Sequence, residues 1–350
     1  MNLLQSSTPV PDWWRSSAED VDHMLGAARK GTVRRLALSH GGRHVRCVVY
    51  GQWEEDRMGP ANFNSALAAG RPEAYCRRSG GARPVLFVLA GVHGQEVEGI
   101  AAALSLIKIM ETGTDAMGND RSSLKSRLEQ MRLIIIPLAN PDGRARMPYA
   151  GWAGLPGSEM TKWGQGTRAN GEPYGWPGCK AVHPMRGDVG LLGAYFDDAG
   201  VNLMHDTWHA PMSDVTKAIL TLVADEGPDM LLNLHSHSFH PHILPENYIP
   251  VTAKRSLNQF ARACYAKMHA SGYKTGPLPG TTADETNGPV PPPFALNSML
   301  WHTGCGMPVL YESPHGCTGH VEPYGYEDIL LLHHMLFDCA AEYLLNPIEK

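Results

Sequence analysis

The 350-residue sequence lacks several features that mark large classes of protein. Its seven cysteines are an odd number, lie far apart and contain no Cys-x-x-Cys pair, which favours reduced thiols in a cytoplasm over a disulfide framework. No run approaches the roughly 20 apolar residues that a bilayer-spanning helix needs. The first residues have no basic start followed by an apolar stretch, the pattern of a secretory signal. We therefore expect a cytoplasmic protein without a membrane partner.

The sequence also has little net charge and few nucleotide-binding or nucleophile motifs. The formal net charge is −5 with both signs interspersed, so the charge pattern does not indicate a nucleic-acid partner. No Gly-x-Ser-x-Gly elbow, P-loop or dinucleotide-binding glycine pattern follows an apolar strand, which argues against serine hydrolases, nucleotide hydrolases and dehydrogenases. The 43% of hydrophobic residues suffices for a large core. Because no internal repeat or linker divides the chain, we expect one domain over residues 1–350.

Hydrophobic periodicity predicts strands that alternate with helices. The predicted strands span 33–38, 43–51, 84–90, 132–138, 229–234 and 307–312, and the predicted helices span 16–29, 95–112, 119–130, 212–226, 254–271 and 325–344. Three segments, 52–83, 144–190 and 273–293, are predicted as loops, and the second is long enough to form a functional wall or lid. This alternation predicts an α/β fold with a mostly parallel sheet that helices cover on both faces.

A histidine and a glutamate follow the most apolar of these strands. The segment Leu86–Ala90 leads into Gly-Val-His93-Gly-Gln-Glu96. A strand that ends in glycine places the next side chains at the rim of the sheet, and residues three apart on a turn can point the same way. An imidazole and a carboxylate that converge are part of a catalytic zinc site. The alternative is that Glu96 only caps a helix or interacts with its dipole.

Two later apolar strands are followed directly by His235 and Glu312. Strand ends on one side of a parallel sheet share one crevice, so these side chains should lie near His93 and Glu96. Two imidazoles and one carboxylate leave the fourth tetrahedral position of a zinc ion for water. Glu312, on a different strand, would take the proton of that water. The pattern predicts one zinc ion per chain, bound by His93, Glu96 and His235.

These residues together resemble the zinc metallocarboxypeptidases and their deacylase relatives of the succinylglutamate desuccinylase and aspartoacylase type. The likeness is carried by His93-Gly-Gln-Glu96, Asn140-Pro-Asp-Gly143, the strand-end His235 and the late Glu312, with the early turn Ser39-His-Gly-Gly-Arg43. It covers nearly the whole chain. The resemblance implies one α/β domain with a central mixed sheet, one zinc ion and hydrolysis of an amide bond.

The substrate-binding residues of the family are only partly present. Carboxypeptidases usually bind the substrate's terminal carboxylate with an Asn-Arg pair, and the corresponding positions here resemble Met204 and His205. Three arginines, Arg144, Arg168 and the further candidate Arg146, remain to polarise the scissile carbonyl. We therefore expect substrate preference to depend on the 144–190 loop and ordinary C-terminal residues to be released slowly.

Four more residues have more than one interpretation each. Asp142 either orients a zinc-bound imidazole or only forms the Pro-Asp-Gly turn. His205 and Asp206 either form a catalytic dyad or belong to the pocket wall and loop hydrogen bonds. His237 alternates onto the side of His235, where it would be an outer hydrogen-bonding partner, a solvent-facing residue or a ligand of a second metal.

The predicted function is hydrolysis of an amide bond by a zinc-activated water with a glutamate base. The substrate would be a peptide, as for a carboxypeptidase. An N-acyl amino acid deacylase of the same superfamily is the alternative, and a non-catalytic binding protein on this scaffold is a further one. The oligomeric state stays open.

Overall fold

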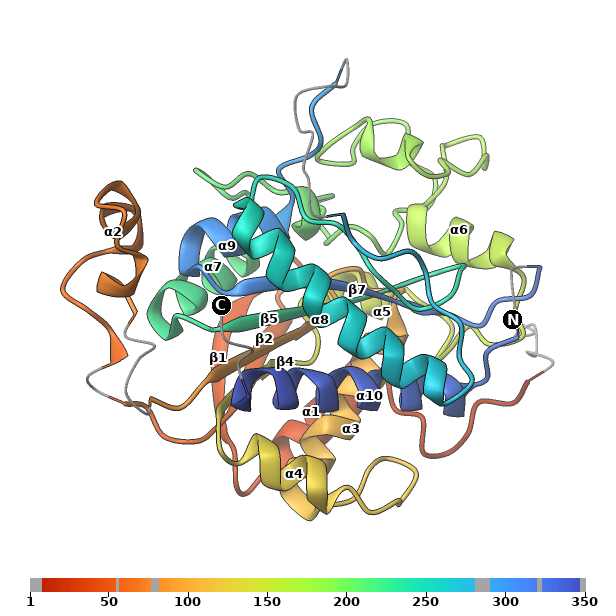
Figure 1. Ribbon diagram of the computed structural model, residues 1–350. Coiled ribbons are helices and arrows are strands. Elements are labelled where there is room, and N and C mark those ends of the chain that lie inside the picture. The colour runs from red at the N-terminus through yellow and green to blue at the C-terminus, as the bar shows by residue number, and fades with distance from the viewer. Residues whose placement is uncertain (1–7, 55–56, 77–81, 281–289, 320–322, 347–350) are drawn as a thin grey trace.

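One seven-stranded mixed sheet organises the chain in the computed structural model, which describes residues 8–54, 57–76, 82–280, 290–319 and 323–346 (Figure 1). The central strands β4, β3, β5 and β7 run parallel, whereas the strands at both edges pair antiparallel. In sheet order the strands are β1 (Thr32–Leu38), β2 (His44–Tyr50), β4 (Arg132–Ile136), β3 (Val85–Ala90), β5 (Met230–His237), β7 (Met307–Pro314) and β6 (His242–Ile243).

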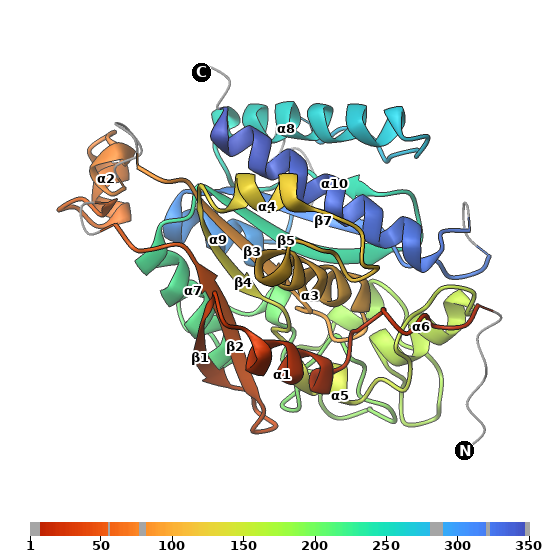
Figure 2. The same ribbon diagram turned by 90° about the horizontal axis from the view of Figure 1, so that it is seen from below.

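Helices cover both faces of this sheet (Figure 2). One face carries α1 (Ala18–Ala27), α3 (Val97–Thr112), α4 (Ser122–Leu128), α8 (Val251–Ala270) and α10 (Tyr326–Leu345), and the other carries α7 (Asp214–Glu226) and α9 (Leu296–Gly304). Strand β3 contributes alternate side chains to the two cores, with Leu86 and Val88 on one side and Phe87 and Leu89 on the other. A strand buried on both faces needs a continuous apolar run, which explains its sequence. The predicted α/β class, with a mixed sheet that is parallel in its centre, is confirmed.

Two of the predicted loops are wrong because each contains helices. The segment 52–83 holds α2 (Phe63–Ala68) and the short helix η2 (Pro72–Ala74), and 144–190 holds α6 (Gly157–Gln165) and η3 (Gly178–Lys180). Such short helices have too few residues for a clear period and depend on tertiary contacts. The ring of Phe63 in α2, for example, packs 5.9 Å from that of Trp301 in α9.

Several other elements differ from the sequence-based expectation. Helix α9 and strand β6 were not predicted, and part of the predicted loop 273–293 lies outside the described residues. Strands β5 and β7 extend to residues 237 and 314, so His235 and Glu312 lie within strands rather than after them. The remaining predicted elements are present, with ends that shift by a few residues, as is usual for boundaries read from sequence.

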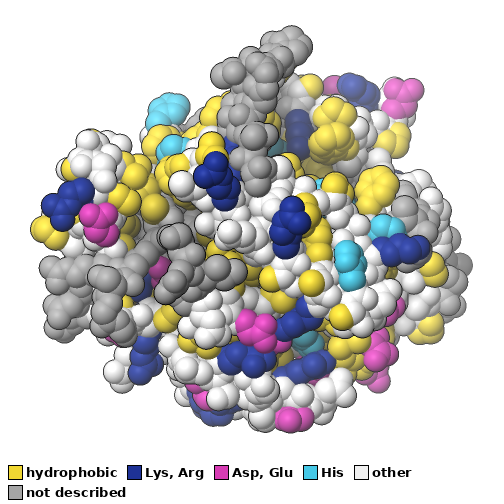
Figure 3. Space-filling view, in the orientation of Figure 1, with side chains coloured by type: hydrophobic (Ala, Val, Ile, Leu, Met, Phe, Trp, Pro, Cys, Tyr) yellow, Lys and Arg dark blue, Asp and Glu magenta, His cyan; other side chains and the backbone are white. Residues whose placement is uncertain are grey.

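Two further properties concern the surface and the helices. On the face shown in Figure 3, described basic and acidic side chains are interspersed rather than gathered by sign. Within the part of the chain that the structure describes, every helix is too short or too polar to cross a membrane.

Candidate metal centre

The turn after β3 brings His93 and Glu96 to the edge of the sheet. Gly91 leaves the strand with φ 63°, a left-handed conformation that favours glycine. At Gly94 a Cβ atom would lie 2.2 Å from the backbone nitrogen of Arg144, so only glycine lets the turn pack on α5 (Pro141–Ala145). Helix α3 begins directly after Glu96, whose side chain makes no capping hydrogen bond. Glu96 thus occupies the N-cap position of α3 without capping the helix through its side chain.

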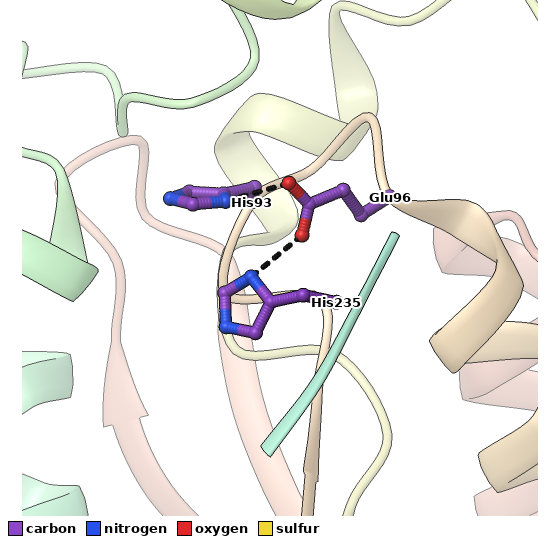
Figure 4. Close-up of side chains that lie close together, drawn as sticks. All are labelled: His93, Glu96 and His235. Atoms are coloured by element: carbon purple, nitrogen blue, oxygen red, sulfur yellow. Dashed lines mark hydrogen bonds and ion pairs between the residues drawn. The ribbon is translucent and has the colours of Figure 1, made fainter. Parts of the chain in front are cut away.

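His93, Glu96 and His235 converge on one another (Figure 4). The Nδ1 atom of His93 lies 2.8 Å from Oε1 of Glu96, and Nδ1 of His235 lies 2.7 Å from Oε2 of the same carboxylate. All three side chains are buried, and one ligand atom from each lies within 4.8 Å of the others. The structure thus brings His235 to Glu96, which lies 139 positions earlier in the chain, and to the nearby His93.

The charges of Glu96 and His93 match what a metal ligand set requires, whereas His235 would have to give up a proton when a metal binds. Burial favours the neutral carboxyl of Glu96, but the two imidazoles outweigh it and lower the pKa of Glu96 to about 2. Burial lowers the pKa of His93, whereas the shared carboxylate outweighs burial at His235 and raises its pKa. An ionised carboxylate and a neutral imidazole are the forms that bind a metal.

Asn202 holds His93 from the side opposite Glu96. Its Oδ1 lies 3.2 Å from Nε2 of His93, so an Nε2–H would donate to it and leave Nδ1 free of a proton. The ring of Tyr195 packs against that of His93 in a tilted arrangement, with centroids 4.1 Å apart. Sequence reasoning missed Asn202 because it concentrated on the next residues of the same segment, Met204 and His205.

Glu312 lies beside His235, because the two are register partners in the parallel pair β5–β7. Burial, together with the negative charge of Glu96, raises the pKa of Glu312 to about 7, while His235 and Lys180 lower it. The Oε2 atom of Glu312 is buried and has no hydrogen-bond partner among the described residues. A carboxyl group whose pKa lies near neutrality and that has a free oxygen beside the ligand group is suited to proton transfer.

The arginines predicted to polarise a carbonyl point elsewhere. Arg144 is buried, and its Nε donates to the carbonyl of Ser16 over 2.7 Å, so it anchors the N-terminal segment. Arg168 pairs with Asp188 at 3.2 Å and lies over the ring of Tyr174. The structure does not bring Arg144 or Arg168 to the metal ligands.

Arg146 is engaged in the same loop. Its guanidinium pairs with Asp198 and donates to the carbonyl oxygens of residues 192, 193 and 196. Burial lowers the pKa of Arg146, and the nearby aspartates oppose this effect. All three candidate arginines therefore hold the fold together instead of facing the group.

Asp142 has a role that neither interpretation anticipated. Its carboxylate accepts hydrogen bonds from Ser39 Oγ at 2.6 Å, Gly41 N at 2.9 Å and Arg43 Nη1 at 2.8 Å. Helix α5 starts at this point, where the Asn140 side chain accepts from the amide of residue 143. Asp142 thus fixes the β1–β2 turn to α5, and its described partners do not include a ligand imidazole.

The pair His205 and Asp206 does not form a dyad. The Asp206 carboxylate accepts the backbone N–H groups of residues 207, 212 and 213 and closes the loop before α7. His205 ends the short helix η4 (Leu203–His205), where burial and then the positive charge of Lys180 lower its pKa to about 3. His205 is therefore neutral at physiological pH.

The contacts of His237 do not indicate a second metal site. Its Nε2 atom lies 2.8 Å from the carbonyl of His240, and burial lowers its pKa to about 4. Within the described residues, His93, Glu96 and His235 are the one His, Cys, Asp and Glu group close enough to hold an ion.

A buried set of two imidazole nitrogens and one carboxylate, at the rim of parallel strands, is the donor set of a catalytic zinc site. The residues therefore fit zinc, both by chemistry and by the convergence of their ligand atoms. The sequence profile of the family described as zinc carboxypeptidase matches residues 32–290. The chain belongs to the zinc carboxypeptidase family. No curated protein sequence matches it.

Solved structures of metallocarboxypeptidases share the fold at low sequence identity. The metallo-carboxypeptidase from Burkholderia cenocepacia has a TM-score of 0.56 and 16% identity, over 93% of this chain and 68% of that one. That from Pseudomonas aeruginosa has a TM-score of 0.54 and 16% identity over the same shares. Bovine thrombin-activatable fibrinolysis inhibitor has a TM-score of 0.55 and 10% identity, over 96% and 99% of the two chains.

Proposed function

We propose that this chain is a zinc-dependent hydrolase of amide bonds of the carboxypeptidase type, with one zinc ion held by His93, Glu96 and His235. The observation that carries the proposal is the shared carboxylate of Glu96, whose two oxygens face the Nδ1 atoms of both histidines at 2.8 and 2.7 Å. When bound, zinc polarises a carbonyl and lowers the pKa of a bound water.

Three residues around the ligands have separate roles in the proposed reaction. Asn202 keeps His93 in the tautomer that presents Nδ1, and the Tyr195 ring limits the rotation of that imidazole. Glu312 takes a proton from the attacking water and later gives it to the leaving amine. With a pKa of about 7 this carboxyl can do both near neutral pH, since neither protonation state is strongly favoured.

A deacylase that acts on N-acyl amino acids is the second candidate. Met204 is buried and apolar, and His205 is neutral because of burial and the charge of Lys180. Neither residue supplies the fork of donors with which an arginine binds a carboxylate. A peptide C-terminus and an N-acyl amino acid both carry a free carboxylate, so in either substrate another group must bind it.

A substrate panel tests the proposal and separates the two candidates. Zinc-loaded protein is incubated with peptides that have free or amidated C-termini and with N-acyl amino acids, with and without a chelator. We expect release of an amine or amino acid that stops on chelation and returns with zinc. No hydrolysis of any class by protein with one equivalent of zinc would contradict the proposal.

A further inference from the structure

Lys180 differs from the arginines of the same segment because it forms no ion pair with an acidic side chain of the described residues. Arg146 and Arg168 both form ion pairs. The Nζ atom of Lys180 instead lies over the ring of Trp176, 5.0 Å from its centroid. Lys180 is also half-buried. Burial lowers the pKa of Lys180, and the charges of Glu96 and Glu312 oppose this effect without an ion pair. A partly desolvated cation that forms no ion pair is costly unless a ligand pairs with it.

The segment that carries Lys180 is fixed to the metal centre on both sides. On one side, Cys179 is buried in a cluster that Tyr195 packs against, and the ring of Tyr195 contacts that of His93 with centroids 4.1 Å apart. On the other side, Nε2 of His183 accepts the backbone N–H of Asn202 at 2.8 Å, and the Asn202 side chain contacts His93. Lys180 lies between these two anchors, so its position relative to the ligands is set by the fold.

The charge of Lys180 acts on the groups around the site. It lowers the pKa of His93, His235, His205 and Glu312. Of the charged groups around His205, Lys180 has the largest effect. The positive charge of Lys180 thus acts both on the metal ligands and on His205, a residue that is itself neutral.

We propose that the ammonium group of Lys180 binds a carboxylate of the substrate beside the metal centre, a role that rests on the proposed hydrolase function. The single point charge of Lys180 replaces the arginine fork. The substrate is then a carboxylate-bearing amide, either a peptide with a free C-terminus or an N-acyl amino acid. Because an ammonium is a point charge without a fixed fork, it accepts carboxylates in more orientations than an arginine does.

The test measures binding rather than turnover, so that it does not depend on catalysis. Zinc-loaded protein in a Glu312→Gln background, chosen to prevent turnover, is titrated calorimetrically with N-acetyl-leucine and with N-acetyl-leucinamide. The compared proteins carry wild-type Lys180, Lys180→Met, Lys180→Gln or Lys180→Arg. The matched control is Lys162→Met, because Lys162 in the same loop also lies over a tryptophan, 5.7 Å from the ring of Trp163.

With Lys180 present, we expect the acid to bind at least 10-fold more tightly than the amide. Lys180→Met and Lys180→Gln should reduce this preference about 10-fold, or about 1.4 kcal/mol, mainly through weaker binding of the acid. Lys180→Arg and Lys162→Met should keep it. The inference is overturned if the preference is absent with Lys180 or survives in either neutral variant at full zinc content. Failure of the hydrolase proposal has a different signature, namely no zinc-dependent turnover of any substrate.

Discussion

At the scale of single residues, Glu312 and the metal ligands have separable roles. We expect Glu312→Gln to keep one zinc ion per chain and to lose roughly two to four orders of magnitude in turnover, the usual effect of a positioned general base. The reason is that Glu312 lies on β7, next to His235 but outside the cluster of three ligand atoms. Metal analysis and steady-state kinetics measure the two effects. Loss of zinc from the variant would make Glu312 a ligand instead.

Asn202 allows a second test at this scale. Replacing Asn202 with Ala removes the acceptor at Nε2 of His93, and we expect zinc affinity to fall roughly 10- to 100-fold, as for other outer partners of metal-bound histidines. Asn202→Asp keeps a side-chain oxygen in place and should retain most of the affinity. Competition with a chromogenic chelator measures both. Equal affinity in the Ala variant would show that Asn202 does not orient the ligand.

At the scale of elements, helix α10 carries a buried histidine that makes stability depend on pH. His333 contacts the carbonyl of Ile329 through Nδ1 at 2.8 Å, and burial lowers its pKa to about 4, below the 6.5 of an exposed imidazole. Between pH 4 and pH 6.5 the imidazole of His333 is therefore protonated in the unfolded chain and neutral in the folded chain. The free energy of unfolding therefore falls as the pH falls from 6.5 toward 4.

The corresponding prediction is a smaller pH dependence in His333→Leu. Between pH 7 and pH 5 the free energy of unfolding of the wild type should fall by about 2 kcal/mol more than that of this variant. The figure comes from the 1.5 pH units between 6.5 and 5, at about 1.4 kcal/mol for each unit. Urea unfolding at a series of pH values gives this difference. The control is His23→Leu, at an exposed position on α1, which should keep the wild-type slope. Parallel slopes for wild type and His333→Leu would contradict the prediction.

At the scale of the whole molecule, the metal should stabilise the fold, because its proposed ligands come from distant parts of the chain. His93 and Glu96 follow β3 and His235 lies in β5, so the three converge only in the folded state. A ligand that binds only the folded state raises the free energy of unfolding by about 4 kcal/mol when its free concentration is 1,000 times its dissociation constant.

Removal of zinc should therefore lower the melting temperature by several degrees, and added zinc should restore it. In His93→Ala, chelator and zinc should have little effect, because one ligand is missing. Calorimetric scans with and without chelator, at matched ionic strength, measure this. A chelator effect that persists unchanged in His93→Ala would place the bound metal elsewhere.

Much of the fold could be predicted from sequence because its main signals are local. The unbroken apolar run of β3 and the helical period of α3 each reflect burial of one element, and short-range patterns record it. The short helices α2 and α6 were missed because their packing comes from distant partners, such as Trp301 against Phe63. Tertiary contacts, rather than propensity, stabilise such elements.

By itself, the sequence determined which residues are available for the chemistry: a His and a Glu three apart after a buried strand, and a His and a Glu on two further strands. The order of parallel strands then makes their proximity predictable, since strand ends share one edge. Only the tertiary structure decided which polar side chains surround them. It directs Arg144 to the N-terminal segment and Asp142 to the β1–β2 turn, and it brings Asn202 to His93. Side-chain partners of this kind depend on how loops fold back across the sheet, and no local pattern in the sequence records that path.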